Sequence, residues 1–328
     1  MQNISLMSVT ELVEKNNIIF GPINSRRFGV SLGIDLSPGF KQCNFDCLYC
    51  ELAPSATVAQ QLQSISVTQI IEALQQHLDD KIDVITLTAN GEPTLYPYLN
   101  ELIEALNTIK GNTQILILSN SATLHDDKVY QALLKLDQVK LSLDAVSADI
   151  FKKIDRPHSS VKIDTIITKL QQFSKDFQGK LFIEILFVKG LNDTKEEIAK
   201  LNEVLCSIDA TRIDLGTIDR PPAYPVEAIS YEELHQLAQL FESTLPVHIA
   251  SRKGTLPTPQ SYTDEEILNT LDKRPLTLED IELLFDKKSQ QRVQEMFNKG
   301  IITRKQMGSV DFFIPTNNLN RKRLKPTF

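Results

Sequence analysis

The segment CNFDCLYCEL, residues 43–52, places three of the four cysteines of this chain close together. Their spacing is CxxxCxxC, formed by Cys43, Cys47 and Cys50. Three thiolates can bind three irons of a [4Fe–4S] cube and leave the fourth iron without a protein ligand, whereas clusters with four cysteine ligands normally only carry electrons. The segment therefore predicts an iron–sulfur cluster with one iron open to chemistry.

Two other interpretations of these cysteines stay open at this point. A structural zinc site needs a fourth nitrogen or sulfur ligand at finger-like spacing, and no histidine lies nearer in the sequence than His77. Cysteines that only fill a hydrophobic core would not alternate with polar residues, yet Asn44, Asp46 and Glu51 lie among and beside them. The cluster is therefore the favoured interpretation.

The composition sets the class of protein. A chain of 328 residues has room for one large domain and a small one, and its hydrophobic share of 41% is that of an ordinary soluble globular protein. The net charge of -7 argues against a general nucleic-acid or membrane binder, and no apolar run approaches the about 20 residues of a transmembrane helix. Residues 1–14 lack the pattern of a secretory signal. Reduced, clustered thiolates suit the cytoplasm, so we expect a cytoplasmic protein without a membrane partner.

After a glycine-rich loop at residues 21–29, apolar, β-branched strands alternate with amphipathic helices. This pattern predicts an α/β fold with a parallel sheet covered by helices, and about six such units are too few for a complete eight-stranded barrel. The expected strands are 30–36, 84–88, 114–119, 139–144, 181–188, 212–216 and 247–250. The expected helices begin near residue 70 and then span 99–109, 126–136, 163–177, 195–207 and 231–241.

The pattern changes after a linker at residues 256–259, which read LPTP. Three short helices are expected at 264–271, 278–285 and 288–299, followed by a hairpin of strands 301–305 and 310–314. This order predicts a small winged-helix-like domain over residues 256–320, and Thr277 to Asp280 carry a capping signal for its second helix. The preceding α/β domain would then comprise residues 1–255, and a basic tail residues 321–328.

Polar groups stand at the expected carboxyl ends of the strands, which is where β/α barrels place their functional groups. Asn90-Gly91-Glu92 ends one strand: glycine permits the close approach of a ligand, and the Glu92 carboxylate can accept a hydrogen bond from an ammonium group. Ser119, Ser142 and Glu184 lie at or near the ends of the next strands. A turn or a strand-end cap is the alternative role of each of these groups, apart from Glu184, whose alternative is an exposed strand position.

The cysteine spacing, the aromatic Tyr49 before the last cysteine and the Gly-Glu-Pro motif resemble those of the radical S-adenosylmethionine (radical SAM) superfamily. The resemblance implies a partial (β/α)6 TIM-like barrel, with a [4Fe–4S] cluster on Cys43, Cys47 and Cys50. It also implies that S-adenosylmethionine chelates the open iron and is cleaved by one electron, so that a 5'-deoxyadenosyl radical takes hydrogen from a substrate. A reductase such as flavodoxin or ferredoxin would supply the electron. The cofactor-binding residues implied are Tyr49, Asn90, Gly91, Glu92, Ser119, Ser142 and Glu184.

Residues from about 20 to 225, including GPINSRRFGVSLGIDLSPGFKQCNFDCLYCEL, NGEPT, LSLDA and DRPP, resemble one branch of the superfamily. This branch comprises the wyosine-type tRNA-modifying enzymes and their uncharacterised relatives. The archaeal-type tRNA enzymes carry additional cysteines for a second cluster, and this chain has none before Cys43. The cysteine count therefore excludes a second cluster and argues against the tRNA imidazoline chemistry of those enzymes. The resemblance leaves RNA modification open but names no substrate, which can be an RNA base, a protein or a small molecule.

Other residues leave alternatives open. Arg26, Arg27 and Arg220 either clamp an anionic substrate or lie on the surface. Cys206 either packs in a helix or faces the pocket as a hydrogen donor. The winged-helix-like domain docks either a nucleic acid or a protein, and its basic residues Lys287, Lys288, Arg292 and Lys299 do not separate the two. The alternative to an enzyme is an iron–sulfur redox sensor that binds DNA through this domain and regulates transcription.

Overall fold

The computed structural model describes residues 18–25, 27–78, 81–249, 259, 261–273, 275–307 and 310–316. Arg26, most of the expected linker and the basic tail 321–328 lie outside these residues, so the expectations for them are not tested.

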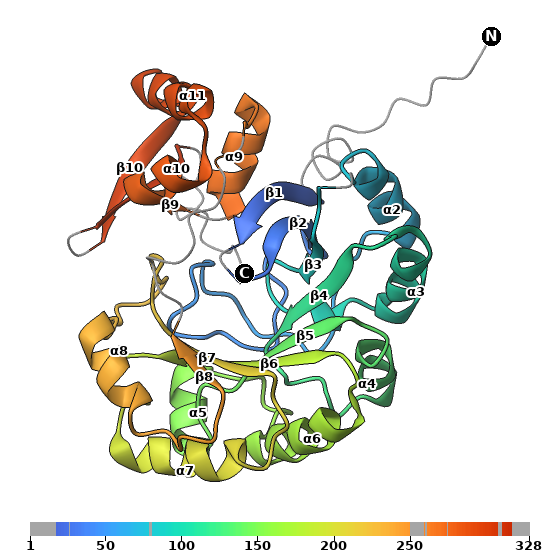
Figure 1. The fold of residues 1–328 in the computed structure, drawn as a ribbon, viewed down its shortest axis with the longest axis vertical. Coiled ribbons are helices and arrows are strands. Elements are labelled where there is room, and N and C mark those ends of the chain that lie inside the picture. Colours follow the sequence, from blue (N-terminus) through green and yellow to red (C-terminus); the bar gives the residue numbers. More distant parts are fainter. Residues whose placement is uncertain are drawn as a thin grey trace.

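The large part of the chain is a curved eight-stranded sheet with helices along its outer face (Figure 1). The strands follow one another in sequence order; the first pair is antiparallel and all later pairs are parallel. The strands are β1 (Ile19–Ser25), β2 (Gly29–Asp35), β3 (Val84–Thr88), β4 (Gln114–Ser119), β5 (Gln138–Ser142), β6 (Lys180–Phe187), β7 (Arg212–Thr217) and β8 (Val247–Ile249). The predicted α/β class with a mainly parallel sheet is therefore confirmed.

The helices of this part pack their apolar stripes on the sheet. In α3 (Leu99–Ile109), the buried residues Leu99, Leu102, Ile103 and Leu106 recur at helical spacing and form that stripe. The remaining elements are α2 (Val67–Gln75), the 3-10 turn η1 (Pro93–Leu95), α4 (Asp127–Leu133), α5 (Ala148–Ile154), α6 (Ile163–Asp176), α7 (Lys195–Leu205) and α8 (Tyr231–Ala238). Interior strands such as β3 are buried on both faces, which explains their continuous apolar sequences.

Some elements differ from the sequence expectation. Most of the predicted glycine-rich loop belongs to β1, an antiparallel edge strand whose apolar pattern is interrupted by Gly21 and Pro22. Phe20 of this strand covers Gly33 of β2, where a Cβ atom would lie 2.1 Å from the Phe20 ring. The short helix α5, between β5 and α6, was not predicted because seven residues give too weak a periodic pattern.

The C-terminal unit has its own hydrophobic core, which includes Tyr262, Ile267, Leu271 and Phe285. Its elements are α9 (Asp264–Lys273), β9 (Leu276–Thr277), α10 (Leu278–Leu284), α11 (Lys287–Asn298), β10 (Ile302–Met307) and β11 (Val310–Pro315). The three strands form one sheet in the order β10-β11-β9. Thr277 and Asp280 form the expected capping box of α10.

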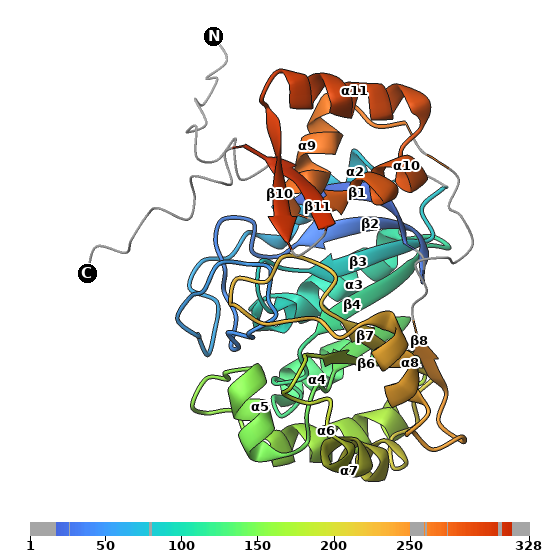
Figure 2. The same ribbon diagram turned by 90° about the vertical axis from the view of Figure 1, so that its left-hand side faces the viewer.

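The C-terminal unit lies against the β1 edge of the large sheet (Figure 2). The Tyr262 hydroxyl donates a hydrogen bond of 2.6 Å to the backbone carbonyl of Pro22 in β1. None of the described helices is both long and apolar enough to cross a membrane.

We predict that Tyr262→Phe lowers the free energy of unfolding of the whole chain by about 1 kcal/mol, because it removes a partly buried hydrogen bond between the two units. Urea unfolding followed by circular dichroism measures this. Tyr98→Phe, at a tyrosine that is 44% exposed, is the matched control. Equal losses in both variants would contradict the prediction.

Candidate functional site

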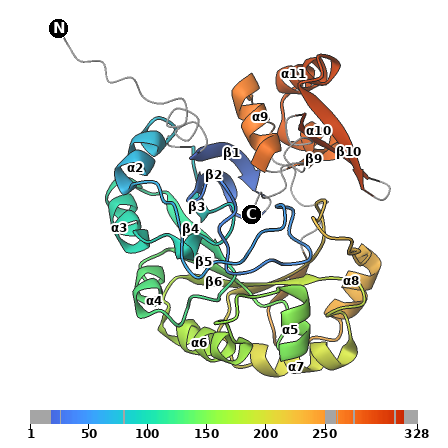
Figure 3. The same cartoon turned by 180° about the vertical axis from the view of Figure 1, so that it is seen from behind.

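The loop that carries the cysteines runs from β2 to α2 and crosses the open centre of the barrel (Figure 3). One side of it pairs with the end of β3 as if it were an additional strand. The Gln42 N–H donates to the Asn90 carbonyl at 2.8 Å, and the Glu92 N–H donates to the Gln42 carbonyl at 3.0 Å. Between these bonds Gly91 has φ +136°, and a Cβ there would lie 1.9 Å from the Gln42 carbonyl oxygen. In this structure the close approach that Gly91 permits is that of the cysteine loop itself.

The other side of the loop is held by the residues that end and follow α5. The Asp46 N–H donates to the Asp155 carbonyl at 3.1 Å, and the Leu48 N–H donates to the Ile154 carbonyl at 2.8 Å. The His158 N–H donates to the Asn44 carbonyl at 2.7 Å. Backbone hydrogen bonds from two different β/α units therefore define the shape of the cysteine loop.

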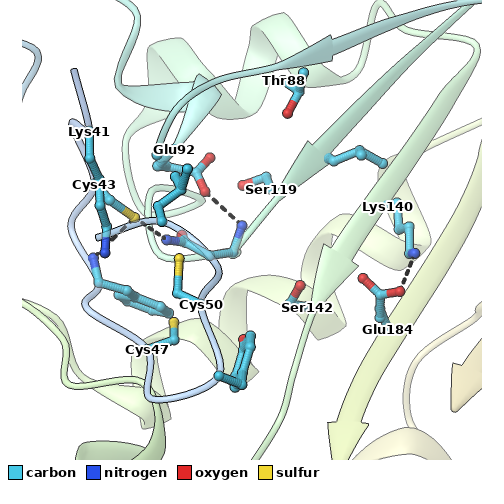
Figure 4. A pocket seen from close by; sticks show the side chains of 16 residues that line it. Lys41, Cys43, Cys47, Cys50, Thr88, Glu92, Ser119, Lys140, Ser142 and Glu184 are labelled. Carbon is cyan, nitrogen blue, oxygen red and sulfur yellow. Dashed lines mark hydrogen bonds and ion pairs between the residues drawn. The ribbon is translucent and has the colours of Figure 1, made fainter. Parts of the chain in front are cut away.

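All three clustered cysteines line one cavity of about 220 Å³. Figure 4 shows their sulfur atoms at one end of it and the side chains of Lys140 and Glu184 at the other. Of the predicted site residues, the cavity is lined by Tyr49, Gly91, Glu92, Ser119, Ser142 and Glu184. Asn90 does not line the cavity. Its N–H donates to an Asp35 carboxylate oxygen at 3.0 Å, so it links the end of β3 to the end of β2.

Several lining residues were not predicted as site residues, among them Lys41, Thr88 and Lys140. Asn120 follows Ser119 at the end of β4, and its side-chain amide lies 2.7 Å from the Asn44 side-chain oxygen and 3.8 Å from the Cys43 sulfur. Lys140 is a single buried lysine in an apolar strand, which is the same signal that drew attention to Glu184. Cys206 is exposed after the end of α7, so it neither packs in the core nor lines the cavity.

The chemistry of the three thiols fits an iron–sulfur cluster. Burial raises the pKa of all three thiols, that of Cys43 to about 12 with a further contribution from the Glu92 charge. Thiolates in this cavity therefore need compensating positive charge, which bound iron supplies. Among the described residues, no group of three or more His, Cys, Asp or Glu side chains is arranged to bind a single metal ion. The cysteines instead surround a shared space.

The Glu92 carboxylate lies beside the cysteines and is 2% exposed. One of its oxygens accepts hydrogen bonds from the Thr94 N–H at 3.0 Å and the Thr94 hydroxyl at 2.6 Å. The other accepts from the Asn120 N–H at 2.8 Å. Burial raises the pKa of Glu92 although these hydrogen bonds oppose it. The carboxylate is thus held in one orientation at the wall of the cavity.

Tyr49 lies close to two buried carboxyl groups, those of Asp144 and Asp155, next to the cysteine loop. The Tyr49 hydroxyl donates to Asp144, whose other oxygen accepts from the Leu186 N–H at 2.8 Å. Asp155 lies 3.5 Å from the Cys47 sulfur. Burial raises the pKa of Asp144 to about 6, against the hydrogen bond from Tyr49. Tyr49, predicted as a cofactor contact, therefore anchors the loop to the segment that follows β5.

The far end of the cavity is a network of compensated charges. One oxygen of Glu184 contacts both the Lys140 ammonium and the Arg27 guanidinium, the latter at 3.0 Å. Arg27 also reaches Asp214 at 3.3 Å. Burial alone would raise the pKa of Glu184, but Lys140 and Arg27 outweigh it and lower that pKa to about 2. Arg27 is thus held by two carboxylates, not free to clamp an anionic substrate, and Arg220 likewise pairs with Glu51.

Residues 38–201 match the family model of the radical SAM superfamily. Over 304 residues, the chain is 39% identical to a UPF0026 protein of Helicobacter pylori. The matched region covers 92% of this chain and 98% of that protein. The chain belongs to the radical SAM superfamily. It is therefore a radical SAM enzyme, and its cofactors are those of the family, a [4Fe–4S] cluster and S-adenosylmethionine, as the sequence predicted.

Two solved structures share the fold of this radical SAM protein. A radical SAM methyltransferase from Sphaerobacter thermophilus has a TM-score of 0.53 at 15% identity, covering 68% of this chain and 67% of that one. TYW1 with a lysine–pyruvate adduct has a TM-score of 0.52 at 19% identity, covering 70% of this chain and 77% of that one. At these identities the likeness supports the fold alone.

We predict that Gly91→Ala strongly reduces cluster binding in this radical SAM protein, because its Cβ would collide with the Gln42 carbonyl and displace the cysteine loop. Iron and sulfide content after anaerobic reconstitution measures this. Gly111→Ala is the matched control: Gly111 also has positive φ, at +56°, but nothing lies within 4 Å of a Cβ there. Wild-type iron content in the Gly91 variant would contradict the prediction.

We also predict a pH dependence from Asp144. Because its pKa is raised from 3.8 to about 6, its contribution to folding is fully present below pH 3.8 and is lost as the pH rises through 6. Between pH 5 and pH 8 the metal-free chain should lose about 1 kcal/mol of unfolding free energy from this group. Asp144→Asn should show a correspondingly smaller loss in urea unfolding. An identical pH dependence in both proteins would count against this assignment.

Proposed function

We propose that this radical SAM enzyme binds its [4Fe–4S] cluster through Cys43, Cys47 and Cys50 and abstracts hydrogen from a substrate in the cavity beside them. The observation that carries the proposal is that three thiols and the polar ends of several strands line one cavity. When bound, the reduced cluster and S-adenosylmethionine supply the radical that takes the hydrogen atom. The residues of this chain bind, orient and shield the reacting groups.

Glu92 is the proposed acceptor for the amino group of S-adenosylmethionine. Its orientation is held by Thr94 and Asn120, and a carboxylate has acceptor positions beyond the three that these residues occupy. Gly91, Ser119 and Ser142, with Tyr49, would complete the contacts with the cofactor, and Asn90 would support them through the strand end. Glu184 is proposed to contact the cofactor or the substrate at the far end of the cavity.

Apolar side chains form part of the wall of the cavity. Phe45, Leu52 and Leu118 line the same cavity, and Phe45 is 4% exposed. Exclusion of water protects reactive intermediates from side reactions. The cavity combines an apolar wall with the polar side chains of Lys140, Glu184 and Ser142. It therefore suits a polar substrate, only part of which enters the barrel.

The substrate remains a choice among an RNA base, a protein and a small molecule. The motifs shared with the wyosine-type branch favour tRNA modification, whereas the net charge of -7 favours a substrate other than a long polyanion. A reductase such as flavodoxin or ferredoxin is the proposed electron donor. The family assignment favours this enzymatic role over the redox-sensing regulator.

We propose that the C-terminal unit is a winged-helix-like docking domain for the substrate or a partner. The described order of α9, β9, α10, α11 and the β10–β11 hairpin supports this proposal. Lys287, Lys288 and Lys299 are exposed on and after α11, which suits a nucleic acid or an acidic protein surface. The proposed boundaries are 1–255 for the barrel, 256–320 for this domain and 321–328 for the tail.

We predict that the reconstituted, dithionite-reduced protein releases 5'-deoxyadenosine from S-adenosylmethionine, and that Cys47→Ala abolishes both the cluster and this product. Glu92→Ala should retain the cluster but bind S-adenosylmethionine about tenfold more weakly, because it loses a charge-assisted hydrogen bond. Chromatography of the product, iron content and equilibrium binding measure these effects.

Cys206→Ala is the matched control, since Cys206 lies on the surface. Full iron content in Cys47→Ala would remove that residue from the ligand set. A reducible cluster that never cleaves S-adenosylmethionine, even with cell extract, would favour the regulator instead.

A further inference from the structure

The segment that follows β7 contacts the cysteine loop at three places. The Arg220 guanidinium pairs with Glu51, the Ala223 N–H donates to the Cys50 carbonyl at 2.8 Å, and the Tyr224 hydroxyl donates to Asp46. These partners lie about 170 residues apart in the sequence. We call residues 220–224 the latch.

The contacts of the latch bracket the two later cysteines. Asp46 directly precedes Cys47, and Glu51 directly follows Cys50. Asp46 is 6% exposed and also accepts from Lys41 at 3.0 Å. The latch therefore contacts both ends of the turn that carries Cys47 and Cys50.

The latch is itself held in place by the barrel. Pro221 and Pro222 are buried, and their rings restrict the backbone of the segment. The Arg156 guanidinium lies 4.6 Å from the centre of the Tyr224 ring. Beyond the latch, the Ile229 N–H donates to the Thr217 hydroxyl at 3.0 Å and returns the chain to β7. The chain on both sides of the latch is thus attached to β7.

The ion pair of Arg220 and Glu51 also has an electrostatic consequence. The second carboxylate oxygen of Glu51 is buried, with no hydrogen-bond partner among the described residues. Without Arg220, this carboxylate, whose side chain is 23% exposed, would lose its ion-pair partner next to Cys50. Negative charge near an iron–sulfur cluster opposes its reduction, which adds one more negative charge.

We propose that the latch positions the cluster-ligating turn, with Arg220 and Tyr224 as positioning residues and with Arg220 also compensating charge beside the cluster. This rests on the proposed ligands Cys47 and Cys50. It assigns a role to the DRPP motif that differs from a substrate clamp: the motif prepares the site for its cluster.

The first arm of the test uses reconstituted full-length protein. In Arg220→Met we expect about a tenfold smaller ratio of reduced to oxidised cluster at a fixed potential, equivalent to about 59 mV for one electron. Loss of iron to a chelator should be about tenfold faster, which corresponds to about 1.4 kcal/mol. Arg220→Lys should restore most of the potential because it retains the charge. Tyr224→Phe should accelerate iron loss with little change in potential, because it removes a hydrogen bond and no charge.

Two matched controls separate the latch from general effects. Lys128→Met removes an exposed cation on α4, and Tyr231→Phe removes a hydroxyl at the start of α8. Both should keep the wild-type potential and iron loss. A wild-type potential and a wild-type rate of iron loss in both Arg220→Met and Tyr224→Phe would overturn the proposal.

The second arm is independent of the cluster. In the metal-free chain, amide hydrogen exchange of residues 46–50 should be about tenfold faster in Tyr224→Phe and Arg220→Met, while β4 stays protected. Unchanged exchange in both variants would overturn the latch even if no cluster can be assembled. Failure of the wild-type chain to bind a cluster would instead contradict the proposed ligands, and the exchange experiment would still decide on the latch.

Discussion

The arrangement of the site depends on one backbone pairing, in which Gln42 is hydrogen-bonded to both Asn90 and Glu92 across Gly91. This short ladder extends the parallel sheet into the cysteine loop. It brings Cys43 next to the Glu92 carboxylate, so that a proposed cluster ligand and the proposed cofactor acceptor share one rigid support. Only glycine allows the two backbones to approach this closely. The Gly-Glu-Pro motif is therefore as much a structural element of the cluster loop as a proposed cofactor contact.

A second constraint is the compensation of charge inside the barrel. Glu184 is paired with Lys140 and Arg27, and Asp214 with Arg27 and Arg212. Ions in the interior that lose their partner are strongly destabilising, so each of these charges is stabilised by its partners. The β1–β2 turn that supplies Arg27 also supplies Phe28, whose ring lies 5.3 Å from that of Phe182 in β6. The turn thereby closes the interior of a barrel whose sheet does not close on itself.

The same principle governs the cysteine loop. Asn44, Asp46 and Glu51, the polar residues that alternate with the cysteines, each bind a partner from elsewhere in the chain. Their presence was an argument for a cluster in the sequence. In the structure they are anchors, which explains why a loop with so little regular secondary structure can present three thiols to one cavity.

Much of the fold follows from the sequence alone, because buried parallel strands and amphipathic helices have distinct periodicities that local residues determine. The same holds for the cysteine spacing and for the strand-end positions of Gly91, Glu92, Ser119 and Ser142, which all line the cavity. Tertiary structure decided the rest: the pairing of β1 across an interrupted pattern, the displacement of Asn90 from the cavity, the pairing of Arg27 and Arg220 with carboxylates, and the place of Lys140. These outcomes depend on contacts between residues far apart in the chain, and the energy of a charged side chain depends on which partner the fold brings to it.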